Sequence, residues 1–430
     1  ITAAEFYGRA LVAARTLPGM KKGEIAAVAQ ARGDVQSVAG LFDEAAASLA
    51  VARKHMKDDP VETARLMRKQ GLLDERRGRF SGALRWLTRA LRRIEDESGD
   101  EAERIRIDLE ITYAGIRERQ GRHRDCITWG LRAARRAEQI DYRQGMAHAY
   151  YLLNLAFTRL RDPRREKYRA LALPILEETG DLVGQANVLN NLGIDAYYEG
   201  KWDEALDLYR RSRDARLRAG DVVDAATQDN NIAEIFSDQG RLEKAEQLFR
   251  NALRVWTGAR FPIGVALARS NLGRVASRAG WIAEGRDLLE QARNEFADIG
   301  AVDFVQETEV RLAENRVLAG DHVIAIGMID KALVDAAGTA ILEVPLLRLH
   351  GYALWQTGRS DEARKALEDS LAAARPAGLV YDEGLGLEAL GRVVGGSEGA
   401  GFREEAATVF AALGVVGTPA VPGPGDTDRV

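Results

Sequence analysis

The stretch from Asn190 to Tyr209 reads NNLGIDAYYEGKWDEALDLY, and its pattern returns along the chain every 40 residues. A shift of 40 gives NNIAEIFSDQGRLEKAEQLF from Asn230, and a second shift gives SNLGRVASRAGWIAEGRDLL from Ser270. A third shift gives VRLAENRVLAGDHVIAIGMI from Val310. Because self-similarity at a fixed period identifies a repeat architecture, we interpret the stretch as a structural unit and not as a catalytic loop.

Each unit is predicted to be a pair of antiparallel helices. Leu189, Leu192 and Ala196 fall at helical spacing and share one face of a first helix. Gly200 follows where the end of a helix favours a left-handed residue, a conformation that glycine adopts at low cost. The same glycine recurs as Gly240, Gly280 and Gly320. A second helix then returns alongside the first.

Small residues recur in pairs, one on each helix of a unit, and predict where the two helices approach most closely. A bulky side chain at such a position would push the helices apart, at a cost of about 1–3 kcal/mol. The pairs are Gly193 with Ala205, Ala233 with Ala245, Gly273 with Gly285, and Ala313 with Ala325.

The composition sets limits on the class of protein. The chain has 430 residues, which exceeds the usual limit for one core, and 46% of them are hydrophobic, as in a folded protein. A net charge of −4 gives no basic field for nucleic acid, and no apolar run reaches the roughly 18 to 20 residues that span a bilayer. No signal peptide is visible, and the single Cys126 fits a reducing compartment. We therefore expect a cytoplasmic protein that binds neither nucleic acid nor membrane.

The repeat resembles the tetratricopeptide repeat (TPR). The positions that carry the resemblance are Leu192-Gly193, Ala196, Gly200, Ala205, Tyr209 and Ser212. The likeness extends over roughly residues 18 to 375, but the period is 40 instead of about 34 and the usual closing proline is missing. Each helix is therefore expected to be about one turn longer, as in the elongated variety found in bacterial signalling regulators.

This resemblance implies an all-α fold, a right-handed superhelical solenoid of about nine antiparallel helix pairs. Residues 1–17 are expected to be the second helix of a truncated preceding repeat, and residues 18–395 the solenoid itself. A closing helix is predicted at 396–414, followed by a disordered Pro/Gly-rich tail at 415–430. Because the chain opens on Ile1, we also expect it to be part of a longer protein.

In tetratricopeptide repeats the first helix of each pair lines a concave face, which implies a set of ligand-binding positions here. The resulting candidates are Asn187, Asn190, Tyr197, Tyr198, Asn230, Glu234, Asp238, Arg274 and Arg278, with Glu307 and Glu314 in the fourth unit. This mixture of amides, acids and arginines would suit an extended peptide. The alternative is a solvated surface without a ligand. A clamp for C-terminal carboxylates is not favoured, because its lysines are missing.

Other polar residues have a structural interpretation. Asn191, Asn231 and Asn271 recur in register, which predicts hydrogen bonds between neighbouring helices. Cys126 takes a slot that holds alanine elsewhere, so we expect a small buried side chain. The five histidines are scattered singly, and phosphate-loop, GxSxG and HExxH motifs do not occur. We therefore predict no catalytic residue, no cofactor and no metal.

The predicted function is that of a non-catalytic module that binds a protein or a peptide. The sequence of the repeats resembles the C-terminal TPR region of actinobacterial class III adenylate cyclases that carry an ATPase domain. It also resembles the repeat arm of MalT-like (STAND-type) regulators. That resemblance implies the sensory or regulatory arm of a larger signalling protein, whose own N-terminal domains could be its partner. The alternatives are a free-standing TPR scaffold or adaptor, RNA recognition, which would need a basic groove, and an enzyme, which would need a convergent polar pocket.

Overall fold

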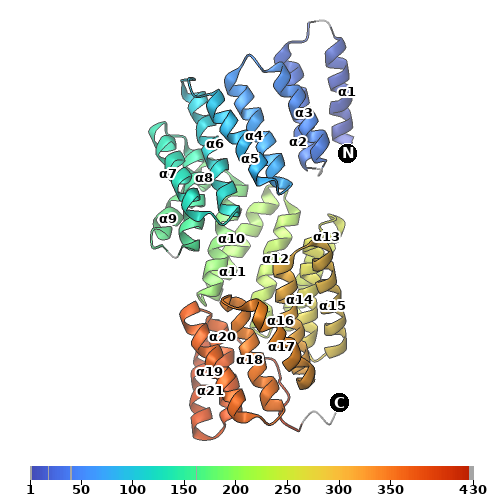
Figure 1. Cartoon of the computed structure of the whole chain (residues 1–430), viewed down its shortest axis with the longest axis vertical. Helices are drawn as coiled ribbons and strands as arrows, with labels where there is room; N and C mark the ends of the chain where they lie inside the picture. The colour runs from blue at the N-terminus through green and yellow to red at the C-terminus, as the bar shows by residue number, and fades with distance from the viewer. Residues whose placement is uncertain (1, 18, 39–40, 161, 426–430) are drawn as a thin grey trace. The chain divides into compact units, whose positions relative to one another are not determined.

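Figure 1 shows the chain as a computed structural model, in which residues 2–17, 19–38, 41–160 and 162–425 are described. Helix is the regular structure throughout these residues, and no strand occurs among them, which confirms the all-α prediction. No helix in the described ranges is both long enough and apolar enough to cross a bilayer.

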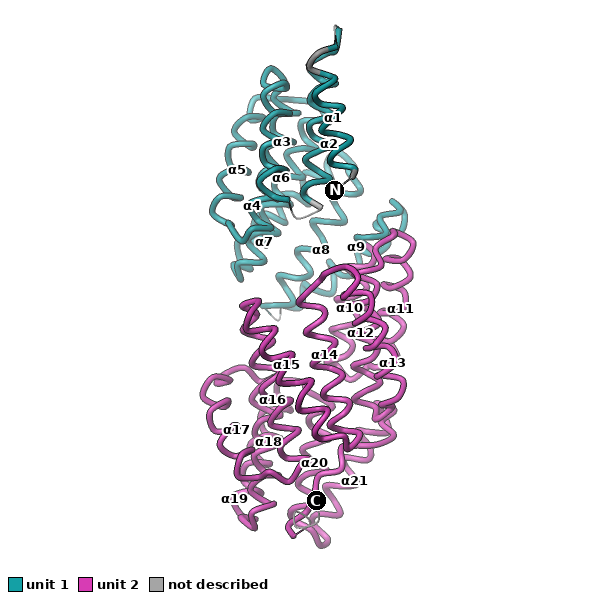
Figure 2. The backbone as a smooth tube through the Cα atoms, turned by 90° about the vertical axis from the view of Figure 1, so that its right-hand side faces the viewer, with its two compact units in different colours: residues 1–184 teal, residues 185–430 magenta. Residues whose placement is uncertain are grey.

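The chain forms two compact units, residues 1–184 and residues 185–430 (Figure 2). The helices of unit 1 are α1 (Thr2–Thr16), α2 (Lys22–Val38), α3 (Phe42–His55), α4 (Pro60–Arg76), α5 (Phe80–Arg93), α6 (Asp100–Arg119), α7 (His123–Gln139), α8 (Arg143–Arg159) and α9 (Arg165–Thr179).

Unit 2 begins within α10. Its helices are α10 (Leu182–Tyr198), α11 (Trp202–Arg218), α12 (Val222–Asp238), α13 (Leu242–Gly258), α14 (Pro262–Arg278), α15 (Ile282–Ile299), α16 (Val302–Leu318), α17 (His322–Ala336), α18 (Ala340–Gln356), α19 (Ser360–Ala377), α20 (Val380–Val394) and α21 (Gly396–Leu413).

The 40-residue period consists of two helices of about 17 residues and two short turns. Each of α11, α12, α13 and α14 has 17 residues. The turn glycines Gly240 and Gly280 have φ values of 77° and 89°, in the left-handed region that ends a helix. Within each repeat the two helices pack on each other, as α12 does on α13 and α14 on α15. The predicted solenoid of antiparallel pairs is therefore confirmed.

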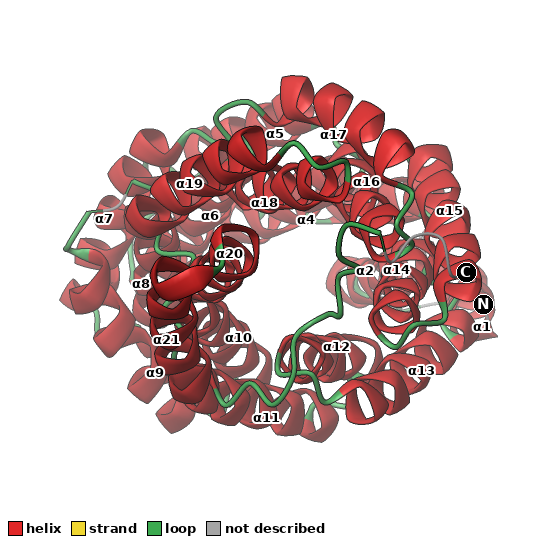
Figure 3. Cartoon of the chain, turned by 90° about the horizontal axis from the view of Figure 1, so that it is seen from below, coloured by secondary structure: helices red, strands yellow, loops and turns green. Residues whose placement is uncertain are grey.

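Within unit 2 the first helices of successive pairs also pack on one another. Contacts join α12 to α14, α14 to α16, α16 to α18 and α18 to α20. Figure 3 shows these first helices on the inner side of the unit, with α13, α15, α17, α19 and α21 on the outer side. The side chains of the first helices therefore determine the chemistry of the inner face.

The predicted close approach of helices is present in the pair α14 and α15. A Cβ atom added to Gly273 would lie 2.9 Å from the backbone oxygen of Gly285 and 2.8 Å from Cγ of Leu289. The reciprocal Cβ on Gly285 would lie 2.8 Å from the backbone oxygen of Gly273. Only glycine at both positions permits this separation of the two helix axes.

Helices occupy both terminal segments for which the sequence predicts a helix. The segment 1–17, predicted to be an orphaned second helix, contains α1, which packs on α2 while α2 pairs with α3. Residue 1 lies outside the described residues. At the other end, α21 occupies the segment where the sequence predicts a closing helix.

The C-terminal tail differs from the prediction of disorder over residues 415–425, which run along unit 2. The backbone N–H of Val416 donates to the carbonyl of Gln239 at 2.8 Å, and Nη2 of Arg392 donates to the carbonyl of Val421 at 2.9 Å. Val421 is buried in the apolar cluster of α16 to α21. A composition rich in proline and glycine excludes a helix but does not prevent an extended segment from docking. Residues 426–430, part of the same prediction, lie outside the described residues.

We expect Gly273→Ala to destabilise the protein by about 1–3 kcal/mol, because the added methyl group would meet a backbone oxygen that cannot move aside. Urea unfolding followed by circular dichroism would measure the loss. The matched control is Gly327→Ala in α17, where an added Cβ has no neighbour within 4 Å. That change should stabilise the helix by about 0.5–1 kcal/mol. Equal effects of the two substitutions would contradict the close-approach interpretation.

Candidate functional site

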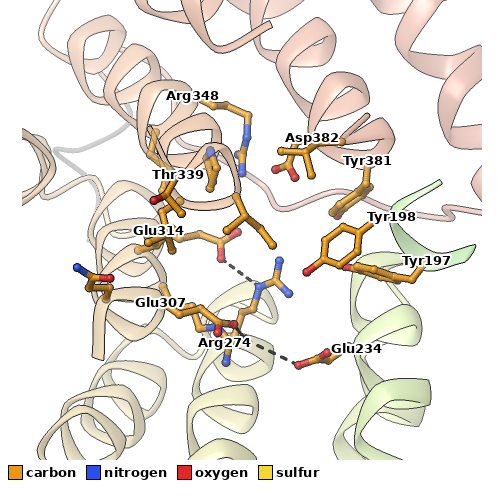
Figure 4. Close-up of a pocket in the computed structure, with 18 of the residues that line it drawn as sticks. Tyr197, Tyr198, Glu234, Arg274, Glu307, Glu314, Thr339, Arg348, Tyr381 and Asp382 are labelled. Atoms are coloured by element: carbon orange, nitrogen blue, oxygen red, sulfur yellow. Dashed lines mark hydrogen bonds and ion pairs between the residues drawn. The ribbon is translucent and has the colours of Figure 1, made fainter. Parts of the chain in front are cut away.

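The inner face of unit 2 contains a pocket of about 550 Å³ (Figure 4). Its lining comes from α10, α11, α12, α14, α16, α18 and α20 and from the turns that precede α18 and α20. One part of the wall is aromatic, with Tyr197, Tyr198, Trp202 and Tyr381. The wall also carries apolar side chains of α18, among them Ile341 and Pro345. Charged side chains complete the lining.

The aromatic wall forms where the first repeat of unit 2 meets the last. The rings of Trp202 and Tyr381 lie 5.3 Å apart, although they are far apart in the sequence. At Gly200, an added Cβ would lie 3.1 Å from the side chain of Val380, so the absence of a side chain allows the turn after α10 to approach α20. The pocket is closed on this side by contacts between repeats that are not neighbours.

Four buried charges form the base of the pocket. The carboxylate of Asp238 on α12 accepts from Arg274 and Arg278 on α14, each at 3.0 Å. Glu314 on α16 contacts the same two arginines, at 3.6 Å and 3.0 Å. Tyr197 completes the cluster from α10, since its hydroxyl donates to Asp238 at 2.7 Å. Two acids and two arginines thus compensate each other and tie four first helices together.

The pKa values reflect this pairing. Burial opposes ionisation of Glu314, but Arg278, Arg274 and Arg348 together lower its pKa to about 2. Burial also opposes the charge on Arg274, whereas Asp238 and Glu314 raise its pKa well above the usual value. Burial and the charge of Asp238 raise the pKa of Tyr197, which keeps its hydroxyl protonated as a donor. Glu314 and Arg274 therefore stay charged across the neutral range, which keeps their pairing intact.

Glu234 on α12 behaves differently from the acids of the base. Burial raises its pKa to about 7, with Arg311 opposing the shift and Glu307 and Asp238 adding to it. Its hydrogen bond comes from Nδ2 of Asn271 at 3.2 Å, and Arg311 lies 3.9 Å away while it pairs more closely with Glu307. At neutral pH this pocket carboxyl is therefore only partly ionised.

A ladder of amides connects neighbouring first helices. Nδ2 of Asn231 donates to Oδ1 of Asn190 at 3.1 Å, and Nδ2 of Asn271 donates to Oδ1 of Asn230 at 2.8 Å. Arg311 takes the same slot one repeat later and donates to Oδ1 of Asn271 at 2.6 Å. The predicted structural role is confirmed for Asn231 and Asn271. Asn191 accepts from Asn190 within its own helix.

The candidate residues predicted from the sequence fall into three groups, and Asn187 lies outside them. The pocket lining holds Tyr197, Tyr198, Glu234, Arg274, Glu307 and Glu314. Asp238 and Arg278, at 1% and 3% side-chain exposure, complete the charged base, and Asn190 and Asn230 belong to the amide ladder. Asn187 accepts a hydrogen bond from Arg216 of α11. The structure thus brings the first two groups together at one pocket, and a binding role for each residue stays a prediction.

Several lining residues were missed by the sequence analysis, above all Arg348, Tyr381 and Asp382. A signal for Arg348 existed: α18 follows α16 by 38 residues instead of 40, and with that shift Arg348 takes the slot of Asn230 and Ser270. For Tyr381 and Asp382 the period offers no signal, because they reach the pocket through contact between repeats that are not neighbours.

Reactive groups lie elsewhere or are absent from the part of the chain that the structure describes. Cys126 in α7 of unit 1 is fully buried among apolar side chains, as predicted, and burial raises the pKa of its thiol to about 12. Within the described ranges, no group of three or more His, Cys, Asp or Glu side chains could hold a metal ion.

The fold is similar to solved structures at low sequence identity. The apo form of the quorum sensor NprR from B. thuringiensis matches with a TM-score of 0.55 and 15% identity, covering 79% of this chain and 99% of that chain. A Rap protein complexed with Competence and Sporulation Factor matches with a TM-score of 0.49 and 18% identity, covering 73% of this chain and 79% of that chain. A STAND protein with a tetratricopeptide repeat sensor from Pyrococcus horikoshii matches with a TM-score of 0.39 and 12% identity, covering 87% of this chain and 53% of that chain. The NprR likeness supports the fold alone, and the two lower scores carry no argument.

Family comparison gives the repeat type. A comparison of the sequence with curated proteins found no match. Models of the tetratricopeptide repeat match residues 185–219, 224–294 and 349–376. These segments include most of the helices that form the pocket. The chain therefore contains tetratricopeptide repeats, and the matched repeats lie in unit 2.

Proposed function

We propose that unit 2 is a non-catalytic binding module that holds a peptide in the pocket of its inner face. The observation that carries this proposal is the pocket itself, whose volume of about 550 Å³ lies within the range of about 300–1,000 Å³ for ligand sites. It combines an aromatic wall, an apolar wall and charges of both signs. Peptides present the same mixture of apolar, amide and charged groups.

Pre-organisation of the site supports this proposal. Arg274 is held between Asp238 and Glu314, and Tyr197 is held by its hydrogen bond to Asp238. Side chains fixed before binding lose little further conformational entropy when a ligand arrives. The acids and arginines of the base serve each other, which suits a rigid recognition surface better than a site for chemistry.

The perturbed carboxyl of Glu234 is a second support. Groups with shifted pKa values concentrate at functional sites, because burial in a cleft is tolerated there for the sake of a ligand. A cationic group of a peptide placed beside Glu234 would favour the ionised carboxylate and lower its pKa again. Tyr198, 39% exposed on the aromatic wall, offers a surface for such a group.

We further propose that this module is the sensory or regulatory arm of a larger signalling ATPase, adenylate cyclase or transcription regulator in the cytoplasm. The resemblance of its repeats to the arms of such proteins supports this. In that arrangement the peptide and the N-terminal domains of the parent chain would be alternative or cooperating partners. A free-standing adaptor that joins two proteins is the second candidate, for which the many exposed side chains of the outer helices offer a surface.

Exchanging two exposed residues of the pocket wall should remove peptide binding without unfolding the protein. The variant is Tyr198→Ala with Ile341→Ser, whose side chains are 39% and 47% exposed. Peptides from the source cell retained by the immobilised protein would be identified by mass spectrometry. We expect retention to fall at least tenfold, as for loss of a central contact.

The matched control for this variant carries Val323→Ser and Val334→Ser on α17, at positions that are 74% and 77% exposed and do not line the pocket. It should retain the same peptides as the wild type. Equal retention by all three proteins would place binding elsewhere, and no retained peptide at all would refute peptide binding.

The raised pKa of Glu234 predicts a specific dependence of stability on pH. Between the ordinary value of 4.5 and about 7, the unfolded chain loses this proton while the folded chain keeps it, so rising pH favours unfolding. Below this window Glu234 is protonated in both states and does not lower the unfolding free energy. Above the window its full destabilising effect is present. Glu234→Gln removes the group, so the variant should gain about 1–3 kcal/mol of unfolding free energy relative to wild type between pH 5 and pH 8.

Urea unfolding of both proteins at pH 5 and at pH 8 measures this difference. The contributions of other titrating groups cancel in it, because the two proteins share those groups. Circular dichroism at pH 5 would verify that the variant keeps the native helix content. A constant difference across this range would show that Glu234 ionises normally in the folded protein.

A further inference from the structure

Arg348 differs from the other arginines of the pocket in having no partner. Arg274 pairs with Asp238 and Glu314, and Arg311 pairs with Glu307 at 2.6 Å. Among the residues that the structure describes, none forms a hydrogen bond or an ion pair with Arg348. The residue is nevertheless only 6% exposed, and its Nε is fully buried. One charged group of the pocket therefore makes no hydrogen bond or ion pair within the described protein.

A buried guanidinium without a partner is energetically unfavourable, because it has lost water and gained no hydrogen bond in return. Structural arginines avoid this state, as the base of the same pocket shows, where each guanidinium contacts two carboxylates. An arginine that lines a pocket and lacks a partner within the protein is thus suited to receive one from a ligand.

The acids nearest to Arg348 do not fill this role. Glu314 is already shared by Arg274 and Arg278. Asp382 points into the same part of the pocket from α20, while Arg348 points into it from α18 (Figure 4). The charge of Arg348 acts on Asp382, yet no ion pair joins them in the described structure. Both groups therefore line the pocket without pairing with each other.

A second polar group of the same pocket is also unused. The hydroxyl of Tyr381 is buried and has no hydrogen-bond partner among the described residues, although Tyr381 as a whole is only 9% exposed. Burial raises the pKa of Tyr381, so its hydroxyl remains a donor at neutral pH. Arg348 and Tyr381 thus bring unused donors to one pocket from two different helices.

Building on the peptide-binding function, we propose that Arg348 binds a carboxylate group of the peptide, with Tyr381 as an additional donor in the same pocket. A guanidinium offers two parallel N–H groups that match the two oxygens of a carboxylate. A phosphate would bring nearly two negative charges close to Glu314, Asp382 and Glu307, which makes it a poorer occupant. The carboxylate is supplied either by the C-terminus of the peptide or by an Asp or Glu side chain.

The test uses the full chain and three pools of random tetrapeptides with acetylated N-termini. The first pool has neutral side chains and a free C-terminal carboxylate. The second is identical but ends in an amide, and the third is amidated with one Glu in last position. Retention of each pool on the immobilised protein is measured by mass spectrometry for wild type, Arg348→Met and Arg348→Lys. Arg364→Met, at an exposed arginine of α19, is the matched control.

We expect the wild type and Arg364→Met to retain a carboxylate pool at least tenfold better than the neutral amide pool. Arg348→Met should lose this preference, and Arg348→Lys should keep part of it. Preference for the first pool identifies the peptide C-terminus, and preference for the third identifies an acidic side chain. The melting temperature of Arg348→Met should equal or exceed that of wild type, because the substitution removes a buried unpaired charge.

Two results would overturn the role of Arg348 while the proposed function stands. One is equal retention of acid and amide pools by the wild type, and the other is an unchanged preference in Arg348→Met. A melting temperature of Arg348→Met several degrees below that of wild type would also refute it, by assigning Arg348 to the fold. If the wild type retains none of the three pools, peptide binding fails and the role of Arg348 fails with it.

Discussion

Each helix pair of unit 2 depends on one point of closest approach, where the side chains must be small. At Gly273 and Gly285 the backbone of one helix contacts the other directly, and neither position has room for a Cβ atom. This constraint fixes how the two helices of a pair lie against each other. Because the constraint returns every 38 to 40 residues, each first helix presents the same slots to the inner face. The positions of the ladder and of the charged base follow from this register.

The charged base shows how such a register can be used. Asp238, Arg274, Arg278 and Glu314 come from three consecutive first helices and alternate in sign. Their burial costs desolvation energy, which only close mutual pairing offsets, and loss of one member would leave an uncompensated charge worth about 3–5 kcal/mol. The network therefore contributes less to stability than to the definition of one arrangement of helices. A rigid base of this kind gives the pocket above it a fixed shape.

Some polar groups of the pocket have hydrogen-bond partners within the protein and others do not, and this contrast indicates which groups serve the fold and which serve a ligand. Paired arginines and the amide ladder hold the structure, whereas Glu234, Arg348 and Tyr381 carry polar atoms whose needs the protein meets poorly or leaves unmet. Groups of the second kind are where a ligand gains free energy on binding. The tail is a further example of recognition, since residues 415–425 are held on unit 2 as an extended segment by backbone hydrogen bonds and by Val421.

The sequence by itself determined the repeat, the helix pairs, the turn glycines and the small residues at their contacts, because these are local and periodic features. The resemblance to the tetratricopeptide repeat also placed Tyr197, Tyr198, Glu234 and Arg274 on the inner face, because it implies that the first helix of each pair lines that face. Tertiary structure alone decided that Trp202 meets Tyr381 and that the tail docks on unit 2. It also decided which arginine of the pocket stays without a partner. The physical reason is that these features depend on the curvature accumulated over several repeats. Small changes of packing at each contact add up, and the sequence of one repeat does not reveal their sum.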